Sequence, residues 1–157
     1  MNILYLSRAQ LPSRKANSIQ VVKMCAAFAS LGHTVTLVVP NALPISKKQV
    51  FDYYGVEHPF DIEVLESSRG LWRHVYGFRS LMLLRRLKPD CVFSRFLAGA
   101  AWSSFVGIPT VHEVHEPIAG RSSRIYVNLL KNGRGFRGFV SITQALKSAM
   151  LQDDRYI

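Results

Sequence analysis

The sequence predicts a doubly wound α/β fold, in which a mainly parallel sheet lies between two layers of helices. Short apolar runs of strand length alternate along the chain with longer segments of helical period. The first run, Asn2–Leu6, is largely apolar, which is typical of a central strand buried on both faces. The crossover to the next strand is long enough for a helix, so the two strands should be parallel. We therefore expect six strands that alternate with helices in three layers.

The first crossover contains a polar loop followed by one helix. Asn17 is expected to be the N-cap of this helix, with Gln20 completing a variant of the capping box. Gly32 is expected to end the helix at C′. The apolar residues at helical spacing are Ile19, Val22, Ala26 and Ala29. The other expected elements are strands at Thr34–Val39, Phe60–Leu65, Cys91–Ser94, from Pro109, and Gly138–Ile142, and helices at Ser46–Tyr54, Gly70–Leu87, Leu97–Phe105, Arg121–Asn132 and from Thr143 or Ser141 to Leu151.

The helix expected at Gly70–Leu87 combines aromatic and basic residues. We expect its apolar side to pack on the sheet and its basic side to be solvated. The expected apolar stripe comprises Leu71, Val75, Phe78, Met82 and Leu83. An alternative stays open, because Trp72, Tyr76 and Phe78 are interleaved with arginines. Such a helix could instead lie on anionic lipid.

Composition indicates a single domain with an anionic partner. A chain of 157 residues with 48% apolar residues can bury a proper core. The net charge is +10, and two stretches, Ser67–Pro89 and Pro117–Gln152, contain no acidic residue. Their basic residues are Arg69, Arg73, Arg79, Arg85, Arg86, Lys88, Arg121, Arg124, Lys131, Arg134, Arg137 and Lys147. This balance favours phosphates, acidic lipid headgroups or nucleic acid, and nucleic acid is the least favoured because no binding motif is present.

The sequence also indicates where the protein is located in the cell and whether it is part of a longer chain. The longest nearly apolar stretch, Leu97–Ile108, is too short to cross a bilayer, and Ile3–Leu6 is too short for a signal-peptide core. We expect a cytoplasmic protein, peripheral at the inner membrane face if the basic helix contacts lipid. Cys25 and Cys91 are expected to be buried thiols. A sheet of this kind normally continues into another strand, so we expect a fragment of a longer protein.

The stretch Gly107–Pro117 is the best candidate for a functional site. Thr110 and Val111 open a short buried strand that runs into four titratable residues, His112, Glu113, His115 and Glu116. Ligands of open α/β sheets bind beyond the carboxyl ends of the strands. We therefore expect these side chains at the ligand-binding edge, where titratable groups are candidates for chemistry.

Two kinds of site are disfavoured by spacing. His112 and His115 should point to opposite faces of a strand, and the motif is not H-E-x-x-H on a helix, so we expect no metal site. Glu113 and Glu116 are too close in sequence to flank a glycosidic bond, which argues against a glycosidase. Glu113 is instead expected to orient the loop or His115. His115 could hydrogen-bond to a substrate hydroxyl, or only within its own loop.

An ordered set of motifs resembles the N-terminal domain of glycosyltransferase family 4. These motifs are N-I-L-Y-L-S at the N-terminus, A-N-S-I-Q at 16–20, A-F-A-S-L-G-H-T-V-T-L-V at 27–38, F-S-R at 93–95, E-V-H-E at 113–116 and F-V-S-I-T-Q-A-L-K at 139–147. The resemblance implies a retaining, metal-independent enzyme of two Rossmann-like domains with its active site between them. It also implies that this domain binds the acceptor and that a C-terminal domain, absent here, holds the nucleotide sugar. The chain alone should then be inactive.

The resemblance also suggests site residues. The histidine of the family's E-x-H stretch, which lies beside the donor sugar, matches His115. The loop Arg8–Ala16 contains no glycine, unlike the glycine pair of many members, so Arg14 or Lys15 would have to supply charge to the donor phosphate. From the residues themselves, the helix start with Asn17, Ser18, Gln20 and Lys23 is either a simple cap or faces a phosphate or acceptor. Arg95 is either a candidate for binding an anionic group or an ordinary surface pair.

The function we expect is the acceptor-binding half of a retaining hexosyltransferase. It would transfer a sugar from a nucleotide sugar to a lipid-linked or polysaccharide acceptor. The alternative is a stand-alone, non-catalytic Rossmann-like module that binds an anionic ligand or a membrane surface. We expect neither a cofactor nor a nucleic-acid partner.

Overall fold

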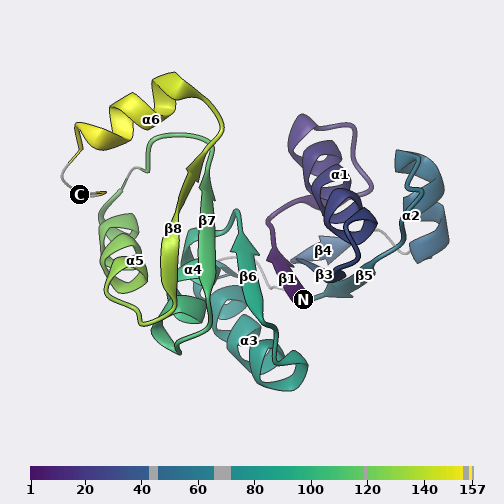
Figure 1. Cartoon of the computed structure of the whole chain (residues 1–157), viewed down its shortest axis with the longest axis horizontal. Helices are drawn as coiled ribbons and strands as arrows, with labels where there is room; N and C mark the ends of the chain where they lie inside the picture. The colour runs from purple at the N-terminus through teal and green to yellow at the C-terminus, as the bar shows by residue number, and fades with distance from the viewer. Residues whose placement is uncertain (43–45, 66–71, 119, 154–155, 157) are drawn as a thin grey trace.

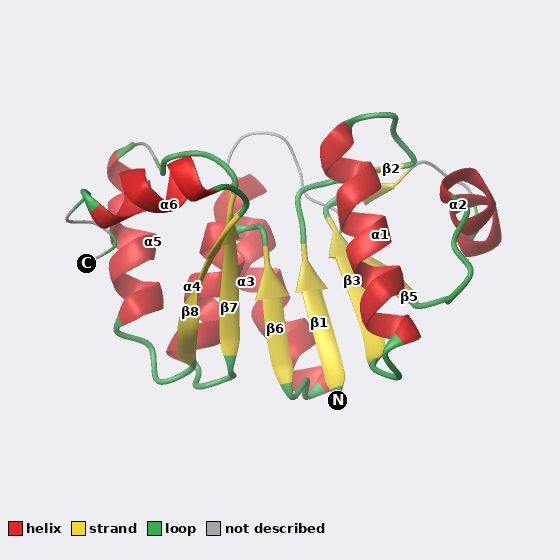
Figure 2. Ribbon diagram, turned by 45° about the horizontal axis from the view of Figure 1, so that its top comes forward, coloured by secondary structure: helices red, strands yellow, loops and turns green. Residues whose placement is uncertain are grey.

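The computed structural model describes residues 1–42, 46–65, 72–118, 120–153 and 156. These residues form a parallel six-stranded sheet in the order β5-β3-β1-β6-β7-β8, with helices on both faces (Figure 1, Figure 2). The strands of this sheet are β1 (Asn2–Leu6), β3 (Thr34–Val39), β5 (Asp61–Val64), β6 (Cys91–Ser94), β7 (Thr110–Val114) and β8 (Phe136–Ser141). The helices are α1 (Ala16–Ser30), α2 (Lys47–Tyr54), α3 (Trp72–Leu87), α4 (Leu97–Phe105), α5 (Arg121–Lys131) and α6 (Gln144–Leu151).

The order of the strands reverses direction at the centre of the sheet. Strand β1 pairs in parallel with β3 on one side and with β6 on the other. The chain first moves outward to β5 and then crosses back to build β6, β7 and β8 on the opposite side. A crevice is expected beyond the strand ends at such a reversal. The predicted doubly wound, mainly parallel Rossmann-like fold is confirmed.

The sequence does not predict a second, two-stranded sheet. The loop after β1 forms a two-residue strand, β2 (Gln10–Leu11), which pairs in parallel with β4 (Asn41–Ala42). Two residues per strand are too few to produce a visible apolar pattern. This pairing fixes the polar loop that leads into α1.

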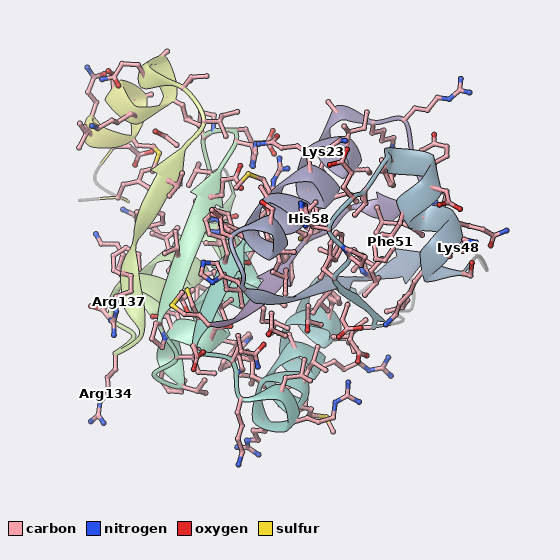
Figure 3. The ribbon with its side chains drawn as sticks, turned by 45° about the vertical axis from the view of Figure 1, so that its right-hand side comes forward. Lys23, Lys48, Phe51, His58, Arg134 and Arg137 are labelled. Carbon is pink, nitrogen blue, oxygen red and sulfur yellow. The ribbon has the colours of Figure 1, made fainter. Side chains whose placement is uncertain are left out.

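The two largest hydrophobic clusters lie on opposite faces of the sheet. Alternate residues of β1 feed each core: Ile3 and Tyr5 face α1 and α2, whereas Leu4 and Leu6 face α3 and α4. This strand is therefore buried on both faces, as its apolar sequence predicts. Each fully buried apolar side chain contributes roughly 1.5–3 kcal/mol relative to an exposed one. Basic side chains such as Lys48 and Arg134 point outward from this frame (Figure 3).

The start of α1 differs from the prediction. The helix begins at Ala16, and its N-cap is Lys15, which makes no side-chain capping bond. The prediction that Asn17 is the N-cap is therefore wrong. The C-terminal end agrees with the prediction. Gly32 lies just beyond the cap residue Leu31, and its φ of +81° is in the left-handed region. The helix buries Ser18, Val21, Val22 and Cys25, whereas Ile19 is 41% exposed.

Helix α3 is rotated relative to its predicted packing. Phe78 and Met82, expected in the apolar stripe, are 59% and 65% exposed. Tyr76 is buried instead, and its hydroxyl lies 2.9 Å from the carbonyl oxygen of Ser7 and 3.0 Å from that of Val38. A buried hydroxyl needs such partners, which orients Tyr76 and the helix toward the sheet. The predicted start at Gly70 and the stripe residue Leu71 lie outside the described residues.

Close backbone packing joins the last strands to α4. Gly135 precedes β8, and an added Cβ there would overlap the backbone of Ile108. Its N–H donates to the Ser104 carbonyl at 3.0 Å, and its own carbonyl accepts from the Thr110 N–H at 2.7 Å. Only glycine allows this approach. Strand β8 begins directly after this glycine, at Phe136, two residues before its predicted start at Gly138.

Two remaining predictions concern the cysteines and the membrane. Both cysteines are free thiols; Cys25 is buried, as predicted, whereas Cys91 is only half-buried. Burial raises the pKa of the Cys25 thiol well above its usual value. No helix among the described residues has the length and apolar character needed to span a bilayer.

Candidate functional site

A cavity of about 360 Å³ lies at the carboxyl ends of three neighbouring strands. Ser7 and Arg8 follow β1, Arg95 follows β6, and His115 and Glu116 follow β7. The lining residues are Ser7, Arg8, Asn17, Arg95, His115 and Glu116. The cavity therefore lies at the reversal of the strand order between β1 and β6, where an α/β sheet is expected to bind its ligand.

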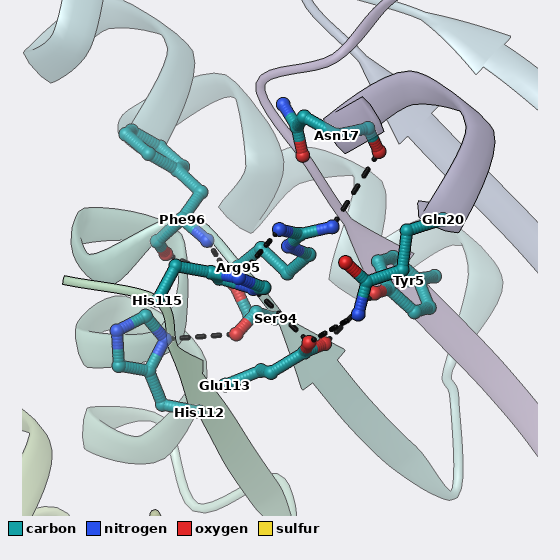
Figure 4. Close-up of polar contacts among 9 residues, drawn as sticks. All are labelled: Tyr5, Asn17, Gln20, Ser94, Arg95, Phe96, His112, Glu113 and His115. Carbon is teal, nitrogen blue, oxygen red and sulfur yellow. Dashed lines mark hydrogen bonds and ion pairs between the residues drawn. The ribbon is translucent and has the colours of Figure 1, made fainter. Parts of the chain in front are cut away.

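The buried carboxylate of Glu113 lies next to the cavity-lining His115. Glu113 in β7 is only 4% exposed. It accepts a hydrogen bond from the Tyr5 hydroxyl at 3.1 Å and another from the Gln20 side-chain amide at 3.1 Å (Figure 4). Burial, and next the nearby Glu113 carboxylate, raise the pKa of Tyr5, so its hydroxyl remains a donor. Glu113 thus ties β1, α1 and β7 together at the strand ends.

His115 lies between Arg95 and Glu113. Its Nδ1 is 2.7 Å from a terminal guanidinium nitrogen of Arg95, and its Nε2 is 3.0 Å from Oε1 of Glu113. A guanidinium can only donate, so Nδ1 must accept and the ring proton is assigned to Nε2. Burial and then the Arg95 charge lower the pKa of His115, while Glu113 opposes them. The geometry therefore favours a neutral imidazole with a defined tautomer.

Two donors in this cluster lack a well-formed hydrogen bond among the described residues. These are Nε of Arg95 and Nε2 of His115, both buried. The short distance from Nε2 to Glu113 thus reflects proximity without good alignment. Another guanidinium nitrogen of Arg95 donates to the backbone carbonyl of Asn17 at 3.5 Å, a long contact. Buried donors without partners cost about 1–3 kcal/mol each, so oxygen atoms of a ligand would be favoured beside them.

His112 does not reach the cavity, which corrects the prediction that it would lie at the ligand-binding edge. Its Nδ1 is 2.8 Å from the carbonyl oxygen of Ser94, and its ring packs edge-on against Phe139. Burial lowers the pKa of His112 to about 4. The expected opposite orientation of His112 and His115 explains the outcome, because one face of β7 points into the core.

The other predicted site residues take three different positions relative to the cavity. Asn17, Arg95, His115 and Glu116 line the cavity, whereas Gln20 supports it through Glu113. Ser18 is buried and donates to the backbone carbonyl of Gln10 at 3.0 Å, and Arg14 is exposed outside the cavity lining. The capping role expected for Gln20 is therefore replaced by a long-range contact.

Sequence reasoning missed three residues of the site. Ser7 and Arg8 line the cavity, and Tyr5 holds Glu113. The strand-edge argument made for residues 112–116 applies equally to the end of β1, so it could have found Ser7 and Arg8. Nothing local in the sequence connects Tyr5 to Glu113. Among the residues that the structure describes, no three His, Cys, Asp or Glu side chains are grouped closely enough to hold a metal ion.

Comparisons with known proteins agree with this architecture. The family model described as Glycosyltransferase Family 4 matches residues 18–156. A structure of the spinosyn rhamnosyltransferase SpnG complexed with thymidine diphosphate is 13% identical, with a TM-score of 0.50. The match covers 90% of this chain and 45% of that chain. SpnG complexed with spinosyn aglycone is 14% identical with a TM-score of 0.47, covering 83% of this chain and 38% of that one.

The similarity to the complex with thymidine diphosphate shows the fold alone, because the sequence identity is only 13%. The chain spans less than half the length of the SpnG structures that it matches. No curated protein sequence matches it.

Proposed function

The chain belongs to glycosyltransferase family 4, and we propose that it is the acceptor-binding half of a retaining enzyme that transfers a sugar from a nucleotide sugar. The cavity at the ends of β1, β6 and β7 carries this proposal, because its position is the one where such a sheet binds ligands. A second domain would close the cavity and hold the donor. This part of the proposal is supported by the chain's covering only 45% of the SpnG chain.

The basic wall of the cavity suits an anionic group. Arg8 and Arg95 line it, and Asn17 brings the first turn of α1 to the same wall. The N-cap Lys15 offers no side-chain acceptor, so the positive end of the helix dipole faces this region without a capping carboxylate. Such groups would stabilise the diphosphate as it leaves, and the proposal requires no metal. Charge on the leaving group is the main electrostatic change in this reaction.

His115 would act by orienting the sugar. Arg95 keeps Nδ1 as an acceptor, so Nε2 carries the proton. We expect a small rotation of the ring away from Glu113 to direct this N–H to a sugar hydroxyl. The bond between the anomeric carbon and the diphosphate breaks, the acceptor oxygen bonds on the same face, and its proton passes to the diphosphate. Glu113 would be a positioning residue in this scheme.

The test is a screen of the intact gene product with nucleotide sugars and sugar-bearing acceptors, followed by the variant His115→Ala. We expect transfer with retained configuration, measured by NMR of the product. His115→Ala should lower kcat by roughly 100-fold or more, the usual effect of losing one donor to the transition state. Its melting temperature should stay close to that of the unsubstituted protein. The matched control is His58→Ala, which changes an exposed histidine away from the cavity.

The outcomes separate the alternatives. Unchanged turnover in His115→Ala would refute the role of this residue but not the transferase. Inversion of configuration would refute the retaining reaction. Binding of ligands without transfer by the intact product would instead support the non-catalytic module.

A further inference from the structure

The outer face of α3 carries large apolar side chains beside basic ones. Phe78 and Met82 are 59% and 65% exposed, and their spacing of four residues places them on the same side of the helix. Arg79, Arg85 and Arg86 share this side by the same periodicity and are exposed. Residues 72–88 contain no acidic residue. From residue 75 onward, where the side chains are described, this face is therefore amphipathic and positively charged.

Packing on the sheet does not require these exposed side chains. The inner side of α3 is formed by Tyr76, Ser80, Leu83 and Leu84, which are all buried. Tyr76 fixes this orientation through its contacts with Ser7 and Val38. A rotation of the helix that buried Phe78 and Met82 would therefore break the contacts of the Tyr76 hydroxyl with these two carbonyl oxygens. These two side chains are available to another surface.

Two hollows flank the helix. One of about 650 Å³ is lined by apolar residues including Val64, Leu65 and Met82, together with Arg79 and Arg86. The other, of about 420 Å³, includes Leu84 and Val106 among its apolar residues and Arg85 and Lys88 as its basic ones. Among the described residues that line the two hollows, Glu63 is the only acidic one, and it pairs with Arg86 at 2.7 Å. The surface thus combines apolar recesses with an excess of cations.

We propose that the outer face of α3 docks on an anionic lipid bilayer. Phe78 and Met82 would enter the boundary between headgroups and acyl chains, and the neighbouring basic side chains would contact lipid phosphates. A nucleic acid suits the face less well, because its centre, Met82, offers no charge to a phosphate backbone. The proposal rests on α3 alone and does not depend on the transferase activity.

The test is co-sedimentation of the protein with vesicles of phosphatidylcholine alone or of an equimolar mixture with phosphatidylglycerol. We expect binding to the anionic vesicles, weakened by added salt, and little binding to the neutral ones. The double variant Phe78→Ser/Met82→Ser should weaken binding by about tenfold or more, because two apolar groups no longer leave water. Arg85→Gln should weaken it about fivefold, which corresponds to roughly 1 kcal/mol for one basic residue near the surface.

Matched variants elsewhere control for general effects. Ile125→Ser/Leu151→Ser removes two other exposed apolar side chains, which are 69% and 65% exposed, and Arg124→Gln removes an exposed arginine from α5. We expect both to bind vesicles as the unsubstituted protein does. Thermal melting identifies any variant that fails to fold. Equal binding to neutral and anionic vesicles, no binding to either, equal loss in the controls, or tighter binding to a DNA duplex would each overturn the proposal.

Discussion

Arg95 determines which nitrogen of His115 carries the proton. Its guanidinium lies 2.7 Å from Nδ1 and lowers the pKa of the imidazole, whereas the Glu113 carboxylate on the other side raises it. Burial is the largest cause of the lowered pKa and persists when either neighbour is changed. The two neighbours should therefore have opposite effects when removed.

We predict that Arg95→Met raises the pKa of His115 and that Glu113→Gln lowers it further. The measurement is an NMR pH titration of the His115 ring protons in each variant. Arg124→Met, a substitution of an exposed arginine on another helix, serves as the control and should leave the titration unchanged. Shifts of the same sign in the two site variants would show that His115 does not lie between these groups as described.

Residue types at the strand ends could be predicted from sequence, but their partners could not. The edge rule placed Glu113, His115 and Arg95 together, because carboxyl ends of parallel strands meet on one side of a sheet. The contact between Gln20 and Glu113 joins residues 93 positions apart. Local patterns carry no information on such pairs, so they predict only a capping role for Gln20 at the start of its own helix.

At the scale of elements, two helices start with similar sequences and different structures. Ser46 and Gln49 form a complete capping box at α2, with the Ser46 hydroxyl accepting from the Gln49 N–H at 3.2 Å. Asn17 and Gln20 have the same spacing in α1, yet Asn17 lies inside the helix and Gln20 bonds to Glu113. The capping pattern is therefore realised only where no tertiary partner competes for the glutamine.

We predict that Ser46→Ala lowers the free energy of unfolding by about 1 kcal/mol, the usual value of an N-cap hydroxyl. Asn17→Ala should change the free energy of unfolding by a few tenths of a kcal/mol at most, since the Asn17 side chain does not cap the helix. Both values are measured by urea denaturation monitored by circular dichroism. An equal loss in Asn17→Ala would mean that Asn17 does cap α1.

Helix α3 shows a second limit of sequence patterns at this scale. Apolar residues occur nearly all around it, so periodicity alone permitted a stripe containing Phe78 and Met82. The choice is made by Tyr76, whose hydroxyl finds two carbonyl oxygens at the sheet. A polar atom on an aromatic ring thus sets the rotation of an amphipathic helix.

At the scale of the whole molecule, the fold follows from the alternation of strand and helix patterns. That alternation predicted the six strands of the main sheet, and right-handed crossovers then allow few topologies. The two-residue pairing of β2 and β4 and the backbone contact at Gly135 were not predicted, because both depend on segments distant in sequence. The central sheet can therefore be predicted from the sequence, whereas the contacts that join its layers cannot.

His112 should make the stability of the whole molecule sensitive to acid. Its side chain is buried beside the Ser94 carbonyl oxygen of β6 and the Phe139 ring of β8, and burial lowers its pKa to about 4, whereas an unfolded histidine titrates near 6.5. Between these values the unfolded chain binds more protons, so the free energy of unfolding falls as pH drops from about 6.5 to about 4. The loss from this residue should approach about 3 kcal/mol.

We predict that the free energy of unfolding of His112→Gln, measured by urea denaturation, falls less steeply over this pH range than that of the unsubstituted protein. Near pH 7 the two proteins should have parallel profiles, because His112 is protonated in neither the folded nor the unfolded state. Equal slopes at acid pH would mean that His112 is accessible to protons in the folded protein.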